Sequence, residues 1–206
     1  MKCDLKIMKL SAKKLFICRN LSLICFLTIF LLFRVDAQQT TGLTSNIILE
    51  KPSSEDDFPI VGFDRTSASL HYDTSDYKGV IHAIGDLQSD IFSVTGVKPE
   101  LISADQSANY EIVIGTLGKS ELIDKLVSSG KLDLKNLKGK WESFAITTIK
   151  NPKPGVKEYL VIAGSDKRGT IYGIYEISRQ LGVSPWYWWA DVPVRKRQSA
   201  YVLQGA

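Results

Sequence analysis

The segment Gly164–Thr170, with the sequence GSDKRGT, combines glycines, a carboxylate and two basic side chains in an order that suits anion binding. It resembles a phosphate-binding loop, but such a loop needs lysine and then serine or threonine directly after its second glycine. Here Thr170 follows Gly169, so we do not expect a nucleotide. A different anion could bind, because a helix N-terminus carries partial positive charge and Arg168 offers a bidentate match to a carboxylate.

Lys167 and Arg168 are therefore the candidate residues for binding an acidic substrate. The alternative is that Asp166 or Ser165 caps the following helix through its side-chain oxygen. In that case the two basic side chains are simply solvated.

Aromatic residues gather in a second segment, 184–193, with the sequence SPWYWWADVP. Three of the four tryptophans of the chain lie there. Flat aromatic rings stack on the apolar faces of sugars, and a nearby carboxylate accepts hydrogen bonds from sugar hydroxyls. Trp186 and Asp191 are the candidate sugar-binding residues. The alternative is a hydrophobic corner or a domain interface, in which alternate rings face inward.

Other catalytic and metal-binding patterns are missing from the sequence. The three cysteines all lie at or before residue 25, and neither His71 nor His82 has partners at metal-ligand spacing. No G-x-S-x-G nucleophile motif occurs. Glycosidases use two carboxylates at a defined separation, which spacing along the chain does not give. We expect no metal and no cofactor, and we name no catalytic residue.

Composition and charge exclude further classes of protein. The chain has 206 residues, of which 44% are hydrophobic and 10% aromatic, and this is enough to bury a core rather than remain disordered. Seven of the 26 basic residues but only two of the 22 acidic ones lie in residues 1–37. The rest of the chain is therefore close to neutral, which argues against nucleic-acid binding.

Residues 1–37 have the pattern of a secretory signal peptide. A basic region is followed by the apolar run Leu21–Phe33 and then by Val35-Asp36-Ala37, which suits a cleavage site. The run rises only about 20 Å as a helix, less than the ~30 Å of a bilayer core. We expect a secreted or periplasmic protein with no stable membrane span after cleavage. The alternative is an uncleaved membrane anchor.

Hydrophobic periodicity predicts an α/β domain with a mixed β-sheet and about three packed helices. Glycines at 169 and 173, four residues apart, would let the last helix approach the sheet closely. A short turn-rich connection suggests that the last two strands pair antiparallel. The main expected elements are helices over 77–94, 121–130 and 168–181, and strands over 110–115, 141–149 and 159–163.

The expected domain organisation has four parts. Residues 1–37 form the signal peptide, 38–45 a polar linker, and 46–193 the α/β domain. Residues 194–206 read as the start of a following domain, so we expect the chain to be truncated.

The two chemical segments, 163–175 and 182–193, resemble the N-terminal domain of glycoside hydrolase family 115, the xylan α-1,2-glucuronidases. The first segment is also similar to accessory domains of hexosaminidases and of family 67 α-glucuronidases. The resemblance covers roughly residues 47–198. It implies an accessory domain of the kind that precedes a TIM-barrel glycosidase domain, with that catalytic barrel absent from this chain.

The resemblance also implies roles and partners. Lys167 and Arg168 would lie near the uronate carboxylate, and Trp186 and Asp191 would border the sugar. The partners would be a glucuronoxylan polysaccharide and the missing C-terminal catalytic domain. Catalysis by this chain alone is not expected. A stand-alone carbohydrate-binding module and a purely structural domain remain alternatives.

Overall fold

A five-stranded sheet forms the centre of the computed structural model, which describes residues 46–103 and 106–204. Its strand order is β4-β3-β5-β7-β6. The first four of these pair in parallel, and β6 runs antiparallel to β7 at the edge. The predicted mixed sheet and antiparallel last pair are therefore confirmed. The strands are β3 (Ser69–Tyr72), β4 (Leu101–Ile102), β5 (Tyr110–Thr116), β6 (Phe144–Lys153) and β7 (Val156–Gly164).

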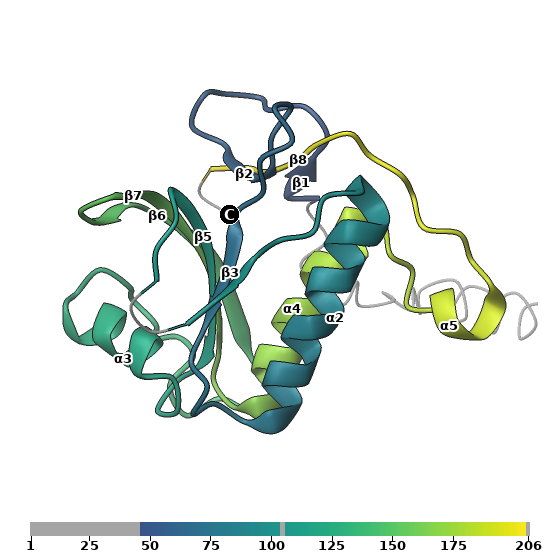
Figure 1. The fold of residues 1–206 in the computed structure, drawn as a ribbon. Helices are drawn as coiled ribbons and strands as arrows, with labels where there is room; N and C mark the ends of the chain where they lie inside the picture. The colour runs from purple at the N-terminus through teal and green to yellow at the C-terminus, as the bar shows by residue number, and fades with distance from the viewer. Residues whose placement is uncertain (1–45, 104–105, 205–206) are drawn as a thin grey trace, which may run out of the picture. The chain divides into compact units, whose positions relative to one another are not determined.

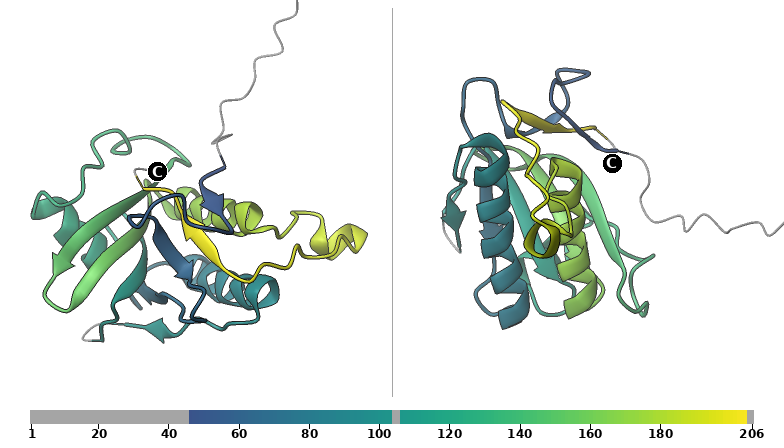
Figure 2. Two further views of the ribbon diagram at one scale, coloured as in Figure 1. Left: turned by 90° about the horizontal axis from the view of Figure 1, so that it is seen from above. Right: turned by 90° about the vertical axis from the view of Figure 1, so that its right-hand side faces the viewer.

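Three helices cover this sheet, as the periodicity predicts. α2 (Lys78–Thr95) and α4 (Lys167–Leu181) lie side by side on one face, and the short α3 (Glu121–Ser128) covers the other (Figure 1). Figure 2 shows the same pair of long helices from two further directions. A single turn, α5 (Tyr187–Ala190), follows α4 and was not predicted.

Alternate residues of the central strands supply two hydrophobic clusters, one on each face. Ile112 and Ile162 belong to the cluster under α2 and α4, whereas Val113 and Val161 belong to the cluster under α3. All four are fully buried. Parallel strands covered on both faces read as nearly continuous apolar runs, which is why β5 was recognisable in the sequence.

The helix ends agree with the sequence in all but one case. Ser120 caps α3 by accepting a hydrogen bond from the Ile123 amide, and α2 and α4 end at left-handed glycines. Ser75 and Asp76, which precede α2, carry side chains of the kind that cap helices, but neither of them caps this helix. The N-cap residue is Tyr77, whose side chain makes no capping bond, because the Asp76 carboxylate instead accepts from the amides of Tyr77 and Thr116.

A second, smaller sheet has the order β1-β8-β2 and is antiparallel. It consists of β1 (Ile48–Leu49), β2 (Phe58–Val61) and β8 (Ala200–Val202). The last strand, β8, therefore pairs with two strands from the beginning of the described chain. That residues 194–206 begin a following domain stays a prediction.

The expected signal peptide (1–37) and linker (38–45) lie outside the described residues. Within the described ranges, no helix is both long and apolar enough to cross a membrane. In the same ranges, no group of three or more histidine, cysteine or acidic side chains could hold a metal ion.

Candidate functional site

The carboxyl ends of the parallel strands meet at one edge of the sheet. β3, β5 and β7 each lead from this edge to a helix, and Lys167 and Arg168 are the first two residues of α4, close behind β7. Ligands of open α/β sheets bind in the crevice outside this edge. Both basic side chains are exposed there. The topology thus presents the predicted anion-binding pair where a ligand could reach it.

Asp166 caps the N-terminus of α4. Its Oδ1 accepts a hydrogen bond from the Gly169 amide at 2.8 Å, and its Oδ2 accepts one from the Glu142 amide at 2.9 Å. These two bonds, the one from Glu142 foremost, hold the pKa of Asp166 below its ordinary value. The capping role weighed for Asp166 is therefore confirmed, and a negative charge already lies at this helix end.

Arg168 is held by an ion pair that the sequence did not suggest. Its Nη1 lies 2.6 Å from Glu142 Oε1, and this hydrogen bond raises the pKa of the guanidinium. The Arg168 side chain remains 66% exposed. Because a guanidinium has five N–H donors in a fixed plane, one ion pair orients it and leaves donors for a ligand.

The residues before β6 bring Glu142 to this edge. A strand was predicted over 141–149, but β6 begins at Phe144 and runs to Lys153, so the predicted start was wrong. Glu142 instead has a left-handed backbone, with φ of 52°. The β6–β7 register pairs Phe144 with Gly164, so the residues before the one strand lie beside those after the other.

Trp141 also lies at this edge, in the same segment, and is 87% exposed. Sequence reasoning missed both it and Glu142 as site residues. The signal that could have found them was the antiparallel pairing itself, since it puts the start of one strand beside the end of its partner.

A close backbone contact holds this segment against α4. A Cβ on Gly169 would lie 2.2 Å from the backbone oxygen of Ser143, and a Cβ on Gly173 would lie 2.9 Å from Ile162 Cγ2. The predicted close approach at these two glycines is confirmed. Gly169 faces the 141–143 segment, whereas Gly173 faces the sheet.

Trp186 and Asp191 lie at the two ends of α5, beyond the other end of α4. Trp186 is 65% exposed, and Asp191 is exposed with φ of 48°. Lys167 and Arg168 are the first two residues of α4, which has 15 residues and is roughly 22 Å long, whereas Trp186 and Asp191 follow its other end. Among the described residues, no hydrogen bond, ion pair or ring contact joins the two pairs. The structure thus places the two basic residues at one end of α4 and the two sugar-binding candidates beyond its other end, and it does not bring the two pairs together. The roles of all four residues stay predictions.

Comparison with known families identifies the domain. The family described as "Glycosyl hydrolase family 67 N-terminus" matches residues 66–177, more than half of the chain. The chain belongs to this family. The match to this family 67 N-terminal domain runs from just before β3 into α4. Lys167 and Arg168 lie within the matched residues, whereas Trp186 and Asp191 lie outside them.

A solved structure adds a second likeness. It is a family GH115 4-O-methyl-α-glucuronidase with specificity for decorated arabinogalactans, 34% identical to this chain, with a TM-score of 0.54. The alignment covers 67% of this chain and 16% of that one. No curated protein matches the chain. The predicted resemblance to the N-terminal domain of a glucuronidase is therefore confirmed, and the chain spans about a sixth of the length of that relative.

Proposed function

We propose that this chain is the N-terminal part of a secreted glycoside hydrolase that removes glucuronic acid, or its 4-O-methyl ether, from a polysaccharide such as glucuronoxylan. The observation that carries the proposal is the 34% identity with a 4-O-methyl-α-glucuronidase. The family match, which is to an N-terminus, supports the same placement. Because the chain aligns with 16% of that enzyme, we propose that the reacting carboxylates belong to a separate catalytic domain.

In this proposal, the edge of the sheet at α4 contributes to recognition of the uronate. Arg168 and Lys167 are the cations nearest the ligand, and Glu142 fixes the plane of the guanidinium. An oriented arginine binds a carboxylate through two parallel hydrogen bonds and discriminates it from a neutral sugar. Arg168 would therefore bind substrate, and Glu142 would be a positioning residue.

The experiment that tests this function uses the native protein from producing cells, captured with an antibody against the described domain. The captured protein is incubated with glucuronoxylan and, separately, with decorated arabinogalactan, and released uronic acid is measured. We expect release of glucuronic acid or 4-O-methylglucuronic acid from at least one polysaccharide, by a protein several-fold larger than this chain. No release from either polysaccharide would contradict the proposal.

Secretion is tested separately. Mass spectrometry of the exported protein should find a mature N-terminus at Gln38. An intact Met1 would instead support the uncleaved anchor.

One observation favours the alternative of a stand-alone carbohydrate-binding domain. Trp141 and Trp186 expose 87% and 65% of their surface, and exposed indoles are suited to stacking on sugars. In that case the captured protein would match the chain in size, would be retarded on a glucuronoxylan affinity gel, and would release no sugar.

A further inference from the structure

The helix pair α2–α4 carries a groove on the side that is turned away from the sheet. The two helices lie side by side, as Figure 1 and Figure 2 show, and the groove follows their C-terminal halves and the segment directly after α4. It has a volume of about 710 Å³, within the range of ligand-binding sites.

Two carboxylates of α2 line this groove. Asp86 and Asp90 are four residues apart, so they lie one turn apart on the same side of the helix, where like charges repel each other. The Tyr175 hydroxyl donates to Asp86 Oδ2 at 2.7 Å, and His82 Nε2 lies 3.8 Å from the same oxygen. Within the described ranges, no lysine or arginine lies within ion-pair distance of either carboxylate. Two negative charges therefore face the groove without a strong counter-charge.

The surroundings of Asp90 leave its charge poorly stabilised. Burial raises the pKa of its carboxyl group, and the neighbouring charge of Asp86 adds to the rise, whereas the Ser178 hydroxyl lowers it. Ser178 lines the groove but is only 3% exposed, and its Oγ makes no hydrogen bond of full geometry to any described residue. Buried polar atoms without such a bond are uncommon in proteins and need an explanation. A cationic donor in the groove would satisfy both groups.

Arg179 also lines the groove, but its charge is already neutralised. Its Nε and Nη2 donate to the two carboxylate oxygens of Glu176 at 2.8 and 2.6 Å. Such a two-bond pair fixes the plane of the guanidinium. Arg179 is thus held by its own helix and does not serve as the counter-charge of Asp90.

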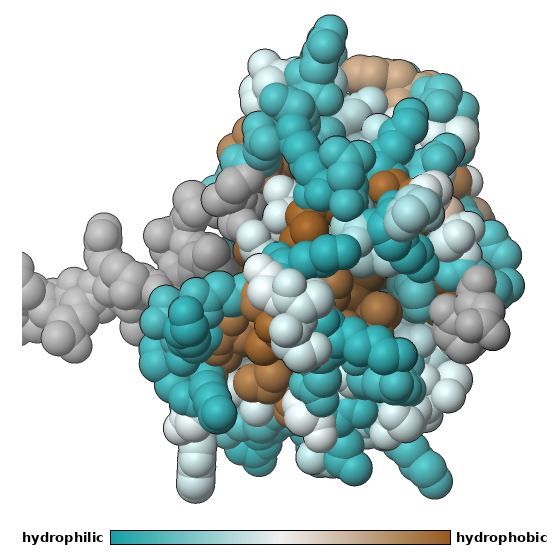
Figure 3. Space-filling view, turned by 90° about the vertical axis from the view of Figure 1, so that its left-hand side faces the viewer, coloured by the Kyte–Doolittle hydropathy of each residue, from teal (hydrophilic) through white to brown (hydrophobic). Residues whose placement is uncertain are grey.

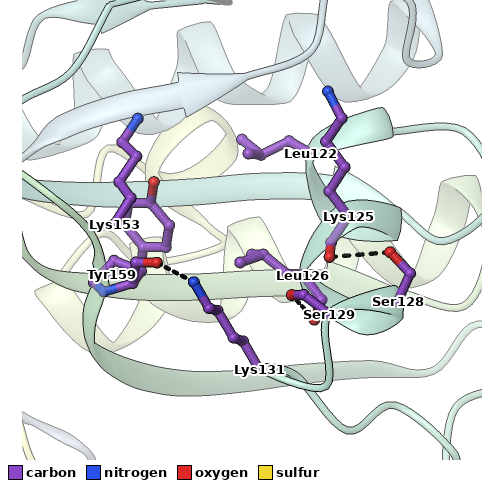
Figure 4. A pocket seen from close by; sticks show the side chains of 9 residues that line it. Leu122, Lys125, Leu126, Ser128, Ser129, Lys131, Lys153 and Tyr159 are labelled. Carbon is purple, nitrogen blue, oxygen red and sulfur yellow. Dashed lines mark hydrogen bonds between the residues drawn. The ribbon is translucent and has the colours of Figure 1, made fainter.

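The opposite side of the sheet carries a groove in which the charges are engaged. Figure 3 shows this side of the molecule, and Figure 4 shows the lysines that line the groove beside α3. Lys153 is ion-paired with the buried Glu111. Lys125 is paired with Glu121, and Lys131 donates to a backbone oxygen. The cations of that groove have partners within the domain, whereas the anions between α2 and α4 lack a cation.

We propose that the groove between α2 and α4 binds an arginine side chain of a partner polypeptide. The guanidinium lies between the carboxylates of Asp86 and Asp90 and also donates to the Ser178 hydroxyl. Arginine fits this place better than lysine, because its planar group carries five donors and stacks on aromatic rings. Tyr175, which is 44% exposed, offers such a ring beside the two carboxylates.

The rest of the groove favours a polypeptide over a free cation. A volume of about 710 Å³ leaves room beside a single guanidinium. Val183 and Pro185 add an apolar surface beyond the C-terminal end of α4. A segment in which an apolar residue follows the arginine would fill both parts. This proposal does not depend on the glucuronidase function.

The test is an NMR titration of the isotopically labelled chain with the blocked peptide Gly-Arg-Leu-Gly. We expect the peptide to shift the amides of Asp86, Asp90 and Ser178. The same peptide with citrulline in place of arginine keeps the shape without the charge and should bind about tenfold more weakly. Ethylguanidinium, a free cation without the apolar neighbour, should also bind more weakly than the arginine peptide. Absence of shifts at these residues, or equal binding of either control probe, overturns the proposal.

A pair of variants sharpens the test. Asp90→Asn should weaken binding of the arginine peptide about tenfold, since a charge-assisted hydrogen bond is lost. Because burial disfavours the Asp90 charge, this variant should melt no lower than the parent chain. The matched control is Asp133→Asn, which makes the same change of charge at an exposed residue after α3 and should bind like the parent chain. Equal weakening by the two variants would overturn the proposal.

The native protein, captured from producing cells, decides whether the groove is open to a separate partner. We expect it to bind a fluorescent form of the arginine peptide as the chain does, and to bind the citrulline form about tenfold more weakly. Binding to the chain but not to the native protein would mean that another part of the protein covers the groove. That result would overturn the docking of a partner.

Discussion

Replacing Gly169 by alanine should destabilise the domain, although alanine is the better helix former. The new Cβ would lie 2.2 Å from the backbone oxygen of Ser143 and 2.9 Å from its carbonyl carbon. These are backbone atoms, so no side-chain rotation relieves the contact. Either α4 or the 141–143 segment must move, and the movement would disturb the ion pair between Arg168 and Glu142.

The magnitude follows from two opposing effects. Alanine in place of glycine within a helix gains about 0.5–1 kcal/mol from backbone entropy. Overpacking of a close contact costs about 1–3 kcal/mol, and a 2.2 Å approach to backbone belongs at the upper end. We expect a net loss of about 2 kcal/mol for Gly169→Ala. Gly85, inside α2, has no atom within 4 Å of its ideal Cβ, so Gly85→Ala should gain about 0.5–1 kcal/mol.

Urea denaturation followed by circular dichroism measures both changes as free energies of unfolding. In thermal unfolding, the Gly169 variant should melt about 4–8 °C lower, and the Gly85 variant about 1–4 °C higher, than the parent chain. The two variants make the same chemical change in helices of one molecule. If both variants were equally stabilised, the close contact at Ser143 would not exist in solution, and the placement of Glu142 beside Arg168 would lose its support.

Three further predictions concern charge and binding. Burial raises the pKa of Asp57, but hydrogen bonds, led by that from the Ser53 side chain, lower it to about 2. Because the folded-state pKa lies below that of the unfolded chain, this stabilisation is present above about pH 4 and is lost as the pH falls toward 2. Asp57→Asn should therefore flatten the loss of stability in urea titrations between pH 5 and pH 2.5, and a variant as acid-sensitive as the parent would contradict this. In the complete enzyme, Arg168→Ala should lower kcat/KM on glucuronoxylan about tenfold and Glu142→Gln about threefold, and unchanged kinetics for Arg168→Ala would remove it from the site. Trp141→Ala should weaken retention on a glucuronoxylan affinity gel without changing the melting temperature, since the residue is 87% exposed; equal retention would exclude a sugar contact there.

Local patterns in the sequence were enough to predict most of the elements. α2, α3 and α4 repeat apolar residues at helical spacing and end at turn-forming residues, and β5 is an almost unbroken β-branched run. The β6–β7 pair is joined by a short turn rich in glycine and proline. Each of these signals lies within a few residues of the element that it specifies.

The pairing of the strands in the small sheet could not be predicted in this way. β8 pairs Val202 with both Ile48 and Phe58, which lie more than 140 positions earlier. Strands of two to four residues carry little periodicity, and nothing local to Val202 identifies partners so far away. Pairing between distant segments depends on the whole fold, because the loop between them must close first.

The candidate site residues also fall into two groups, those that local sequence predicted and those that only the folded structure revealed. Sequence by itself determined that Lys167 and Arg168 follow a strand and begin a helix, and that Asp166 is suited to cap it, because these are properties of neighbouring residues. Only the tertiary structure decided that the Glu142 carboxylate holds Arg168 and that the Glu142 amide donates to the capping carboxylate of Asp166. Those contacts join groups from different segments of the chain, and their distances are set by strand register and helix packing, which residue order alone does not specify.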